Sequence, residues 1–254
     1  MIQFSVLKLN SKRITHYSQG GEDGLLEYIL SKLPHRDKFL VEFGAWDGKH
    51  LSNGFHLINQ FGYSGVLIEM DPERFEDLEK NMSEYKCVCI NAMVGYEGNS
   101  KLDFILGQTD IPQDFDLLSI DIDGNDYQVW DSMNEYKPKV VIIEINSSIF
   151  PGVDLINDPG HPFELFVSGS SVSAINKLGI TKGYRLIANV GCNAIFVREN
   201  LYDLFHQKIL NEFDLFTFEA IPKRELNYSQ RIRSFMFAFA RPDLIRRLAR
   251  RLAH

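Results

Sequence analysis

Apolar stretches alternate with amphipathic stretches over most of the chain. Four of the apolar runs are continuous and do not alternate with polar residues, at residues 40–43, 65–68, 116–120 and 139–145. Continuous apolar runs are typical of strands that are covered on both faces. Amphipathic segments separate the runs, at residues 50–62, 72–82 and 125–133, and a further run spans residues 86–95. Strands that alternate with helices predict a doubly wound, mostly parallel α/β sheet with helices on both faces.

The pattern changes after residue 146. A turn-rich stretch is followed by a helical segment at residues 171–184 and by two strand-like segments at 184–190 and 192–197, with Gly191 between them. Two strands joined so closely must run antiparallel, because a parallel return needs a crossover of about a dozen residues or more. The sequence therefore predicts a parallel sheet that ends in an antiparallel strand.

The two ends of the chain lie outside this alternating region. Residues 4–9 are strand-like, residues 17–24 form a turn containing glycine, and residues 25–33 have one apolar helical face. Residues 200–254 have helical patterns. We therefore divide the chain into an N-terminal cap and helix at 1–37, a central α/β domain at 38–199 and a helical extension at 200–254.

The composition is that of a globular protein, with 44% hydrophobic and 24% charged residues, and it excludes a fibre or a disordered chain. The net charge of −7 is uneven: from residue 222 onward nine Lys or Arg face two acids, so this tail carries +7 and the preceding residues −14. An acidic body is unsuited to binding nucleic-acid phosphates. We expect no nucleic-acid partner.

The tail itself has the pattern of a short cationic amphipathic helix. Apolar residues at 244, 245, 248 and 252 share one face, with arginines mostly opposite. One interpretation is a surface helix packed on the acidic body or on the second chain of a homodimer. The other is peripheral contact of residues 235–254 with an anionic membrane surface.

Cysteine usage and hydropathy indicate the compartment. Three cysteines cannot all pair within one chain, and Cys87 and Cys89 alternate along one apolar run, which favours reduced thiols. No apolar run approaches the ~20 residues that span a bilayer. These features predict a cytoplasmic protein.

The turn after the first strand is the first candidate for binding chemistry. Ligands of doubly wound sheets bind at the carboxyl ends of the strands, where Glu42, Gly44, Asp47 and Gly48 occur in the sequence EFGAWDG. The glycine fingerprint of dinucleotide-binding turns is absent, and Asp47 would repel a pyrophosphate. These acids suit a cation or hydroxyl and ammonium donors. S-adenosylmethionine offers a sulfonium, an amino group and a ribose diol, and it has no phosphate.

The ends of the next two strands fit the same ligand. Glu69 follows the second run, where an acid can accept both hydrogen bonds from a ribose diol. Asn91, Ala92 and Met93 follow the third run and suit an adenine edge.

These residues resemble a known family. Residues 38–198 are similar to class I S-adenosylmethionine-dependent methyltransferases, particularly the FkbM-like group, on VEFGAWDG, GVLIEMDPERFEDLEKN, DLLSIDIDGNDYQVW and the final antiparallel pair. The resemblance implies a Rossmann-like, seven-stranded sheet in the order 3-2-1-4-5-7-6. It also implies cofactor contacts, by Glu42, Gly44, Ala45, Asp47, Ser52, Asn53, Glu69, Asn91, Ala92 and Asp121. Trp46 takes the place of the usual middle glycine, which departs from the family pattern.

A second cluster of acids surrounds the fourth and fifth strands. Asp121, Asp123 and Asp126 follow the fourth run, and Glu144 and Asn146 end the fifth. Hard oxygen ligands without Cys or His suit Mg²⁺. Metal-dependent O-methyltransferases of this fold resemble this arrangement, which would make Asp121, Glu144 and Asn146 the metal ligands. The alternative is that the aspartates bind the cofactor or cap the next helix.

The remaining candidates concern proton transfer and closure of the site. A hydroxyl acceptor needs a base, and Asp121 or His161 in the loop PGHP could serve. The turn at residues 17–24 either covers the cofactor or caps the helix that follows. We assign Trp46 and Trp130 to the core, and the alternative for each is a platform for the substrate.

Together these features predict an S-adenosylmethionine-dependent O-methyltransferase that acts on a hydroxyl of a sugar or saccharide, as in a surface glycan or its precursor, with or without Mg²⁺. The alternatives are a natural-product or nitrogen acceptor, a non-catalytic binding module in which Trp46 obstructs the cofactor, and a nicotinamide oxidoreductase. The missing phosphate-binding turn disfavours the last.

Overall fold

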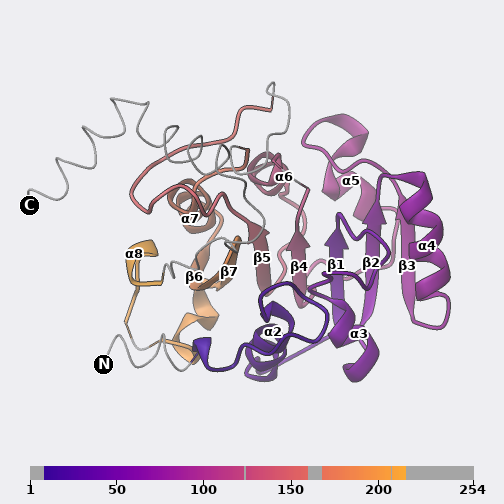
Figure 1. Cartoon of the computed structure of the whole chain (residues 1–254), viewed down its shortest axis with the longest axis horizontal. Helices are drawn as coiled ribbons and strands as arrows, with labels where there is room; N and C mark the ends of the chain where they lie inside the picture. Colours follow the sequence, from indigo (N-terminus) through magenta and orange to yellow (C-terminus); the bar gives the residue numbers. More distant parts are fainter. Residues whose placement is uncertain (1–8, 123, 160–167, 207, 216–254) are drawn as a thin grey trace, which may run out of the picture.

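The structure is a computed structural model of the whole chain, and it describes residues 9–122, 124–159, 168–206 and 208–215. Its centre is a seven-stranded sheet in the order β3-β2-β1-β4-β5-β7-β6 (Figure 1). The strands are β1 Phe39–Phe43, β2 Ser64–Glu69, β3 Cys87–Asn91, β4 Leu117–Ile120, β5 Val140–Glu144, β6 Tyr184–Val190 and β7 Asn193–Arg198. This order is the one that the sequence predicted, so the doubly wound, Rossmann-like fold is confirmed.

Strand directions are also as predicted. β1 pairs in parallel with β2 and β4, β2 with β3, and β4 with β5. β7 is antiparallel to both β5 and β6. β1 and β4 are adjacent and parallel at the centre of the sheet, so their carboxyl ends lie side by side. The predicted site residues follow these strand ends, at what we call the carboxyl edge of the sheet; the opposite side, where these strands begin, is the amino edge.

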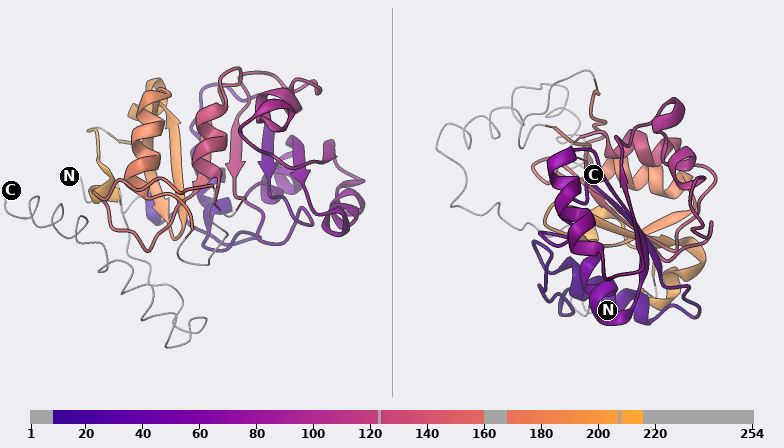
Figure 2. Two further views of the ribbon diagram at one scale, coloured as in Figure 1. Left: turned by 90° about the horizontal axis from the view of Figure 1, so that it is seen from above. Right: turned by 90° about the vertical axis from the view of Figure 1, so that its right-hand side faces the viewer.

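Helices cover both faces of the sheet, and the right-hand view of Figure 2 shows the twisted sheet between them. One face packs against α5 Leu102–Leu106, α6 Asp126–Ser132 and α7 Val172–Thr181. The other packs against α2 Glu22–Ser31, α3 Phe55–Phe61 and α4 Pro72–Met82. The strands between these two cores are therefore apolar on both faces, which explains their continuous apolar runs.

Local sequence explains where several helices begin. The Asp71 carboxylate accepts hydrogen bonds from the Glu73 and Arg74 amides, and Pro72 opens α4 at a position where no amide hydrogen is needed. Ser171 caps α7 in the same way through the Ala174 amide. Both helices start within a residue or two of their predicted positions.

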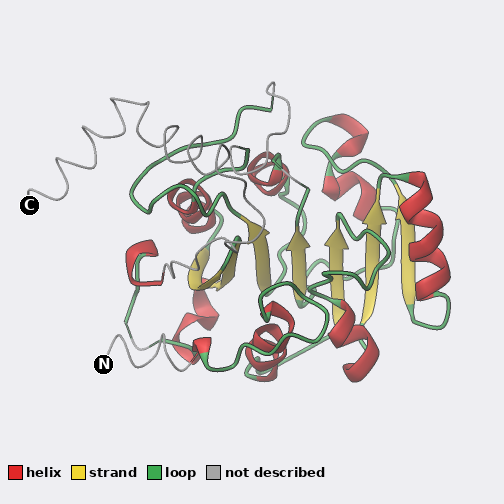
Figure 3. Cartoon of the chain, viewed as in Figure 1, coloured by secondary structure: helices red, strands yellow, loops and turns green. Residues whose placement is uncertain are grey.

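The structure differs from the sequence predictions at the periphery (Figure 3). Leu9 is helical where a strand over residues 4–9 was expected, and residues 1–8 lie outside the described part. The predicted helical extension begins as the 3₁₀ segment Glu199–Leu204 and the short helix α8 Glu212–Leu215. The basic tail beyond residue 215 lies outside the described residues, so its predicted amphipathic helix and membrane contact stay predictions. Neither α5 nor the 3₁₀ turn Gly98–Ser100 was predicted, because both are too short to show a helical period.

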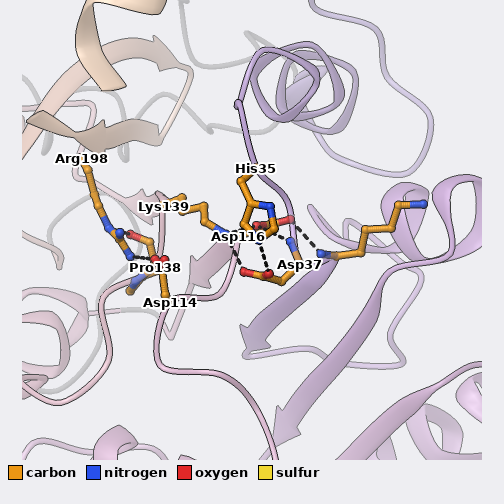
Figure 4. Close-up of polar contacts among 8 residues, drawn as sticks. His35, Asp37, Asp114, Asp116, Pro138, Lys139 and Arg198 are labelled. Atoms are coloured by element: carbon orange, nitrogen blue, oxygen red, sulfur yellow. Dashed lines mark hydrogen bonds and ion pairs between the residues drawn. The ribbon is translucent and has the colours of Figure 1, made fainter. Parts of the chain in front are cut away.

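The amino ends of β1, β4 and β5 are joined by a buried ionic network (Figure 4). The Lys139 Nζ atom lies 2.8 Å from the Asp116 carboxylate and 2.7 Å from that of Asp37. Asp116 is fully buried and also accepts hydrogen bonds from the Asp37 and Lys38 amides. The residues that precede three neighbouring strands are thus held together at the edge of the sheet opposite the predicted site.

Two further predictions concern the cysteines and membrane-spanning segments. The thiols of Cys87, Cys89 and Cys192 are free, as expected. No helix in the described part of the chain combines the length and apolar character needed to span a membrane.

Candidate active site

A cavity of about 590 Å³ lies at the carboxyl ends of the strands. Its walls come from the ends of β1, β2, β4 and β5, from the residues after β3 and from the β6–β7 turn. Pockets for small ligands typically measure about 300–1,000 Å³ and occur at this edge of doubly wound sheets. Four carboxylates lie on the wall, those of Glu42, Glu69, Asp121 and Glu144.

Glu42 is the most buried of these acids, with 4% of its surface exposed. Its carboxylate accepts hydrogen bonds from the Ser52 hydroxyl at 2.6 Å and the Asn53 amide at 2.8 Å. Burial raises the pKa of Glu42, and these hydrogen bonds oppose that rise in part. Ser52 and Asn53 therefore line the cavity and hold a buried acid toward it with neutral donors, and their predicted contact with a cofactor stays a prediction.

Glu69 ties the first loop to the end of β2. One carboxylate oxygen accepts the Trp46 amide and the other accepts the Asp71 amide, both at 2.8 Å. Each carboxylate oxygen has two acceptor positions, so both oxygens can still accept a hydrogen bond from a ligand. The two backbone donors fix the orientation of the carboxylate at the cavity wall.

The glycines of the first loop are required for close packing. A Cβ atom on Gly44 would lie 1.8 Å from the backbone oxygen of Asp121, and the φ angle of Gly44 is +70°. At Gly48, where φ is +77°, a Cβ atom would lie 2.6 Å from the Leu78 side chain. A side chain at either position would push the loop away from β4 or α4. Gly44 thus lets the ends of β1 and β4 approach each other behind the cavity.

Asp121 and Glu144 stand together at the ends of β4 and β5, where Cys192 of the β6–β7 turn faces them. Burial raises the pKa of Cys192 to about 12, and the nearby carboxylates of Glu144 and Asp121 contribute to the rise. The thiol therefore stays protonated at neutral pH and is a poor nucleophile. This end of the cavity combines two carboxylates with a neutral thiol.

Three predicted site residues do not line the cavity. Asp47 turns back and caps the loop, accepting from the Lys49 and His50 amides. The Asn91 amide donates to the backbone oxygens of Glu69 and Met70. Both side chains satisfy local backbone groups at strand and loop ends, so the structure does not place them where a ligand in this cavity would touch them.

Asn146 is the third of these residues, and it concerns the predicted metal site. Its side-chain oxygen accepts from the amide and the hydroxyl of Ser148, and its nitrogen donates to the Ser168 backbone oxygen. The cavity wall includes Asp121 and Glu144 but not Asn146. The predicted three-residue Mg²⁺ set is therefore not assembled on this wall. His161 and Asp123 lie outside the described residues.

Other wall residues were not predicted from the sequence. Gln19 reaches the cavity from the N-terminal turn, and Arg74 reaches it from the first turn of α4. Trp46, which we assigned to the core, is instead 42% exposed on the wall, with the Arg74 guanidinium 4.1 Å from its ring centre. Its φ of +50° is in the left-handed region that non-glycine residues rarely adopt. Trp130 is 1% exposed and lies in the core as predicted.

The N-terminal turn adjoins both the start of α2 and the cavity. The N-cap of α2 is Gly21, which has no side chain to cap the helix, and the predicted cover over a cofactor stays a prediction. Glu22 and Asp23 open α2, and the Asp23 carboxylate accepts hydrogen bonds from the amides of His16, Tyr17 and Ser18. The same turn places Gln19 on the cavity wall. A signal for this contact is lacking in the sequence, because it depends on how α2 docks against the sheet.

The sequence matches no protein-family model and no curated protein. Among solved structures, it is similar to the CMeT domain of a citrinin polyketide synthase, with 11% identity, a TM-score of 0.45 and coverage of 70% of this chain and 51% of that one.

Two further structures give similar values. A SAM-dependent methyltransferase from Aquifex aeolicus has 10% identity and a TM-score of 0.40, covering 68% of this chain and 87% of that one. CalS10, an amino pentose methyltransferase from Micromonospora echinaspora, was solved with SAM bound and has 12% identity, a TM-score of 0.41 and coverage of 70% and 89%. The fold assignment rests on the observed sheet order rather than on these values.

Proposed function

We propose that the cavity binds S-adenosylmethionine and that the protein transfers its methyl group to a hydroxyl oxygen of a sugar or saccharide. The observation that carries this proposal is that Glu42 and Glu69, at the ends of adjacent parallel strands, line one cavity. A pyrophosphate would be repelled there, whereas a cationic nucleoside with a free ribose diol finds acceptors.

The wall residues fit this cofactor in chemical type. Glu69 has acceptor positions for the ribose hydroxyls, and Ala92 after β3 offers a small neighbour for the adenine ring. Glu42 and Asp121 provide negative charge for the amino group and the sulfonium. The proposal retains Gly44, Ala45, Ser52 and Asn53 as wall residues and drops Asp47 and Asn91, whose side chains are turned elsewhere.

The cofactor supplies an activated methyl group on a cationic sulfur. In the transfer, the new O–C bond forms as the S–C bond breaks, and the hydroxyl proton must pass to a base. Asp121 stands at the end of β4 on the cavity wall and is our candidate for that base. Most of the rate gain would come from holding the acceptor oxygen in line with the methyl group. No step is assigned to a metal, because Asn146 is turned away.

The acceptor end of the cavity supports a polyhydroxylated substrate. Asp121 and Glu144 flank it, and carboxylates are strong acceptors for sugar hydroxyls. The same acids would attract an amine, so an amino sugar or another nitrogen acceptor is the alternative to test. A panel of neutral saccharides, amino sugars and phenolic natural products, assayed with radiolabelled cofactor, separates these classes.

The binding half of the proposal is tested by calorimetry with S-adenosylhomocysteine. We expect the wild type to bind and Glu69→Gln to lose tenfold or more in affinity, which is about 1.4 kcal/mol. Glu73→Gln, an exposed acid on the first turn of α4 outside the cavity, should bind as the wild type does. No heat with the wild type would support a non-catalytic module obstructed by Trp46, and tight NADH binding would support an oxidoreductase.

The catalytic half is tested separately with Asp121→Asn. Loss of a general base typically costs about 10²–10⁴-fold in rate. We expect kcat of the variant to fall by about 100-fold or more at neutral pH. At higher pH the variant should regain part of the wild-type activity. An unchanged kcat would remove Asp121 as the base and return attention to His161.

A further inference from the structure

A second cluster of ligating side chains lies apart from the cavity, between the N-terminal segment, α2 and α3. It consists of His16 in the N-terminal segment, Glu27 on α2 and His56 on α3. None of the three lines the cavity. In the described part of the chain it is the one group of three His, Cys, Asp or Glu side chains whose ligand atoms all lie within 4.8 Å of one another.

The geometry of the cluster is close to that of a metal site. The Nε2 atom of His56 lies 2.8 Å from a carboxylate oxygen of Glu27. The rings of His16 and His56 are stacked, with centres 3.8 Å apart and planes 4° from parallel. Ligand atoms of a tetrahedral zinc ion are about 3.4 Å apart, since its bonds to nitrogen and oxygen are about 2.0–2.2 Å long. The three ligand atoms, which lie within 4.8 Å of one another, are therefore close to the separation that zinc requires, and a turn of the His16 ring is the main movement needed.

The chemistry of the donors selects the kind of ion. Two imidazoles and one carboxylate favour zinc or a similar divalent transition metal over Mg²⁺ and Ca²⁺, which prefer oxygen ligands alone. Three protein ligands leave a fourth position for water. We propose that His16, Glu27 and His56 form a zinc-binding site that fastens the N-terminal segment to α3.

Two of the ligands are already positioned for this role. His56 is 6% exposed and contacts the ring of Phe61 edge-on, so its ring is held by packing. Glu27 projects from the middle of α2 and has a half-buried side chain. His16 is exposed, and its imidazole must turn out of the stacked arrangement so that a ring nitrogen points to the ion. A backbone hydrogen bond to Asp23 anchors the residue while its side chain turns.

The site would connect two segments that reach the cavity. Three residues after His16, Gln19 lies on the cavity wall, and three residues before His56, the Asn53 amide donates to Glu42. An ion that joins His16 to His56 would therefore hold the N-terminal turn at a fixed distance from the loop that orients Glu42. The proposal does not depend on the reaction that the cavity performs.

The test is a titration of the full chain with zinc chloride after treatment with a chelator. We expect one ion per chain by calorimetry, a rise in melting temperature on adding zinc, and visible d–d absorption of the Co²⁺ form typical of a tetrahedral site. His16→Ala should lower zinc affinity by tenfold or more. Because His16 is exposed, this variant should keep the melting temperature that the wild type has in chelator.

Two further variants complete the test. Glu27→Gln can keep the hydrogen bond to His56 but removes the anionic ligand, so it should also weaken zinc binding by tenfold or more. His35→Ala removes an exposed histidine outside the cluster and should bind zinc within twofold of the wild type. Absence of zinc binding by the wild type would overturn the proposal. Equal zinc affinity in the wild type, His16→Ala and Glu27→Gln would do so too, because the ion would then be bound elsewhere.

Discussion

Buried carboxylates have different partners at the amino edge and at the carboxyl edge of the sheet. At the amino edge, the fully buried Asp116 carboxylate is matched by the Lys139 ammonium at 2.8 Å (Figure 4). At the carboxyl edge, the hydrogen bonds to the buried Glu42 and Glu69 carboxylates come from neutral amides and a hydroxyl. An ion pair offsets the charge of a buried acid, whereas neutral donors orient the carboxylate without supplying a compensating positive charge.

This difference in partners indicates that the acids at the amino edge stabilise the fold and that those at the carboxyl edge serve ligand binding. A buried charge that faces a cavity and keeps its negative field is costly to the folded state unless a ligand supplies the opposite charge. The amino edge therefore contributes to folding as it stands, and the carboxyl edge is arranged for a cationic or hydroxyl-rich ligand. Substitutions at the amino edge should change the free energy of unfolding, whereas substitutions at the carboxyl edge should change the affinity for a ligand.

Replacing Lys139 with methionine should have the largest effect on stability. Burial alone would lower the pKa of Lys139, and the ion pairs with Asp116 and Asp37 raise it above its ordinary value. Without the ammonium, the buried Asp116 carboxylate would keep the hydrogen bonds from the Asp37 and Lys38 amides but would lose its ion pair. We expect Lys139→Met to lower the free energy of unfolding by about 3–5 kcal/mol, measured by urea denaturation at pH 7.

Lys137→Met is the matched control, because Lys137 is exposed and two residues away. It should change the free energy of unfolding by less than about 0.5 kcal/mol. A Lys139→Met protein as stable as the control would show that the amino edge does not need its ion pair, and the contrast between the edges would fail.

At the carboxyl edge, Glu42→Gln should affect binding more than folding. Burial raises the pKa of Glu42, so its ionised form is disfavoured in the folded state. An acid whose pKa is higher in the folded chain than in the unfolded chain, where it is about 4.3, binds its proton more tightly when folded. It therefore stabilises the folded state at low pH, and this stabilisation is lost as the pH rises through the folded-state pKa. A glutamine at this position is neutral at every pH and carries no cost of ionisation in a buried place, so Glu42→Gln should be as stable as the wild type or more stable, by about 1 kcal/mol at most.

The same variant should bind S-adenosylhomocysteine or S-adenosylmethionine tenfold or more weakly, a loss of about 1.4 kcal/mol. Urea denaturation at pH 7 and pH 4 together with calorimetry measures both quantities. A variant that is several kcal/mol less stable, or one that binds the cofactor normally, would place Glu42 with the structural acids of the amino edge.

The continuous apolar runs in the sequence predicted the strands of the sheet, because these strands are covered on both faces and are apolar throughout. They missed α5, since five residues hold little more than one helical turn. Strand ends also located Glu42, Glu69, Asp121 and Glu144 at one edge, because parallel strands carry their carboxyl ends to the same side.

Strand position does not decide which way a side chain turns. Asn91 and Asn146 stand at strand ends but use their amides on nearby backbone groups, which short polar side chains do readily. Gln19 and Arg74 reach the cavity because of how α2 and α4 dock, and Trp46 lies exposed on the cavity wall in the loop after β1. Such contacts depend on tertiary packing, and a single sequence holds no local signal for them.

Asp37→Asn should have the smallest effect, and its pH dependence identifies the amino edge. The hydrogen bond from Lys139 lowers the pKa of Asp37 against the opposing effect of burial. A lowered folded-state pKa contributes stability above the unfolded pKa of about 3.9, and this stability is lost as pH falls through the folded value. The side chain is 28% exposed, so we expect the wild type to exceed the variant by about 1 kcal/mol or less at pH 7. In urea denaturation from pH 7 to pH 3, the free energies of unfolding of the wild type and of Asp37→Asn should converge below about pH 4.

Asp77→Asn, which replaces an exposed acid on α4, is the control and should show no such convergence with the wild type. A difference between wild type and Asp37→Asn that stays constant with pH would mean that the Asp37 charge adds nothing to the network, and Asp116 with Lys139 would then hold the amino edge alone.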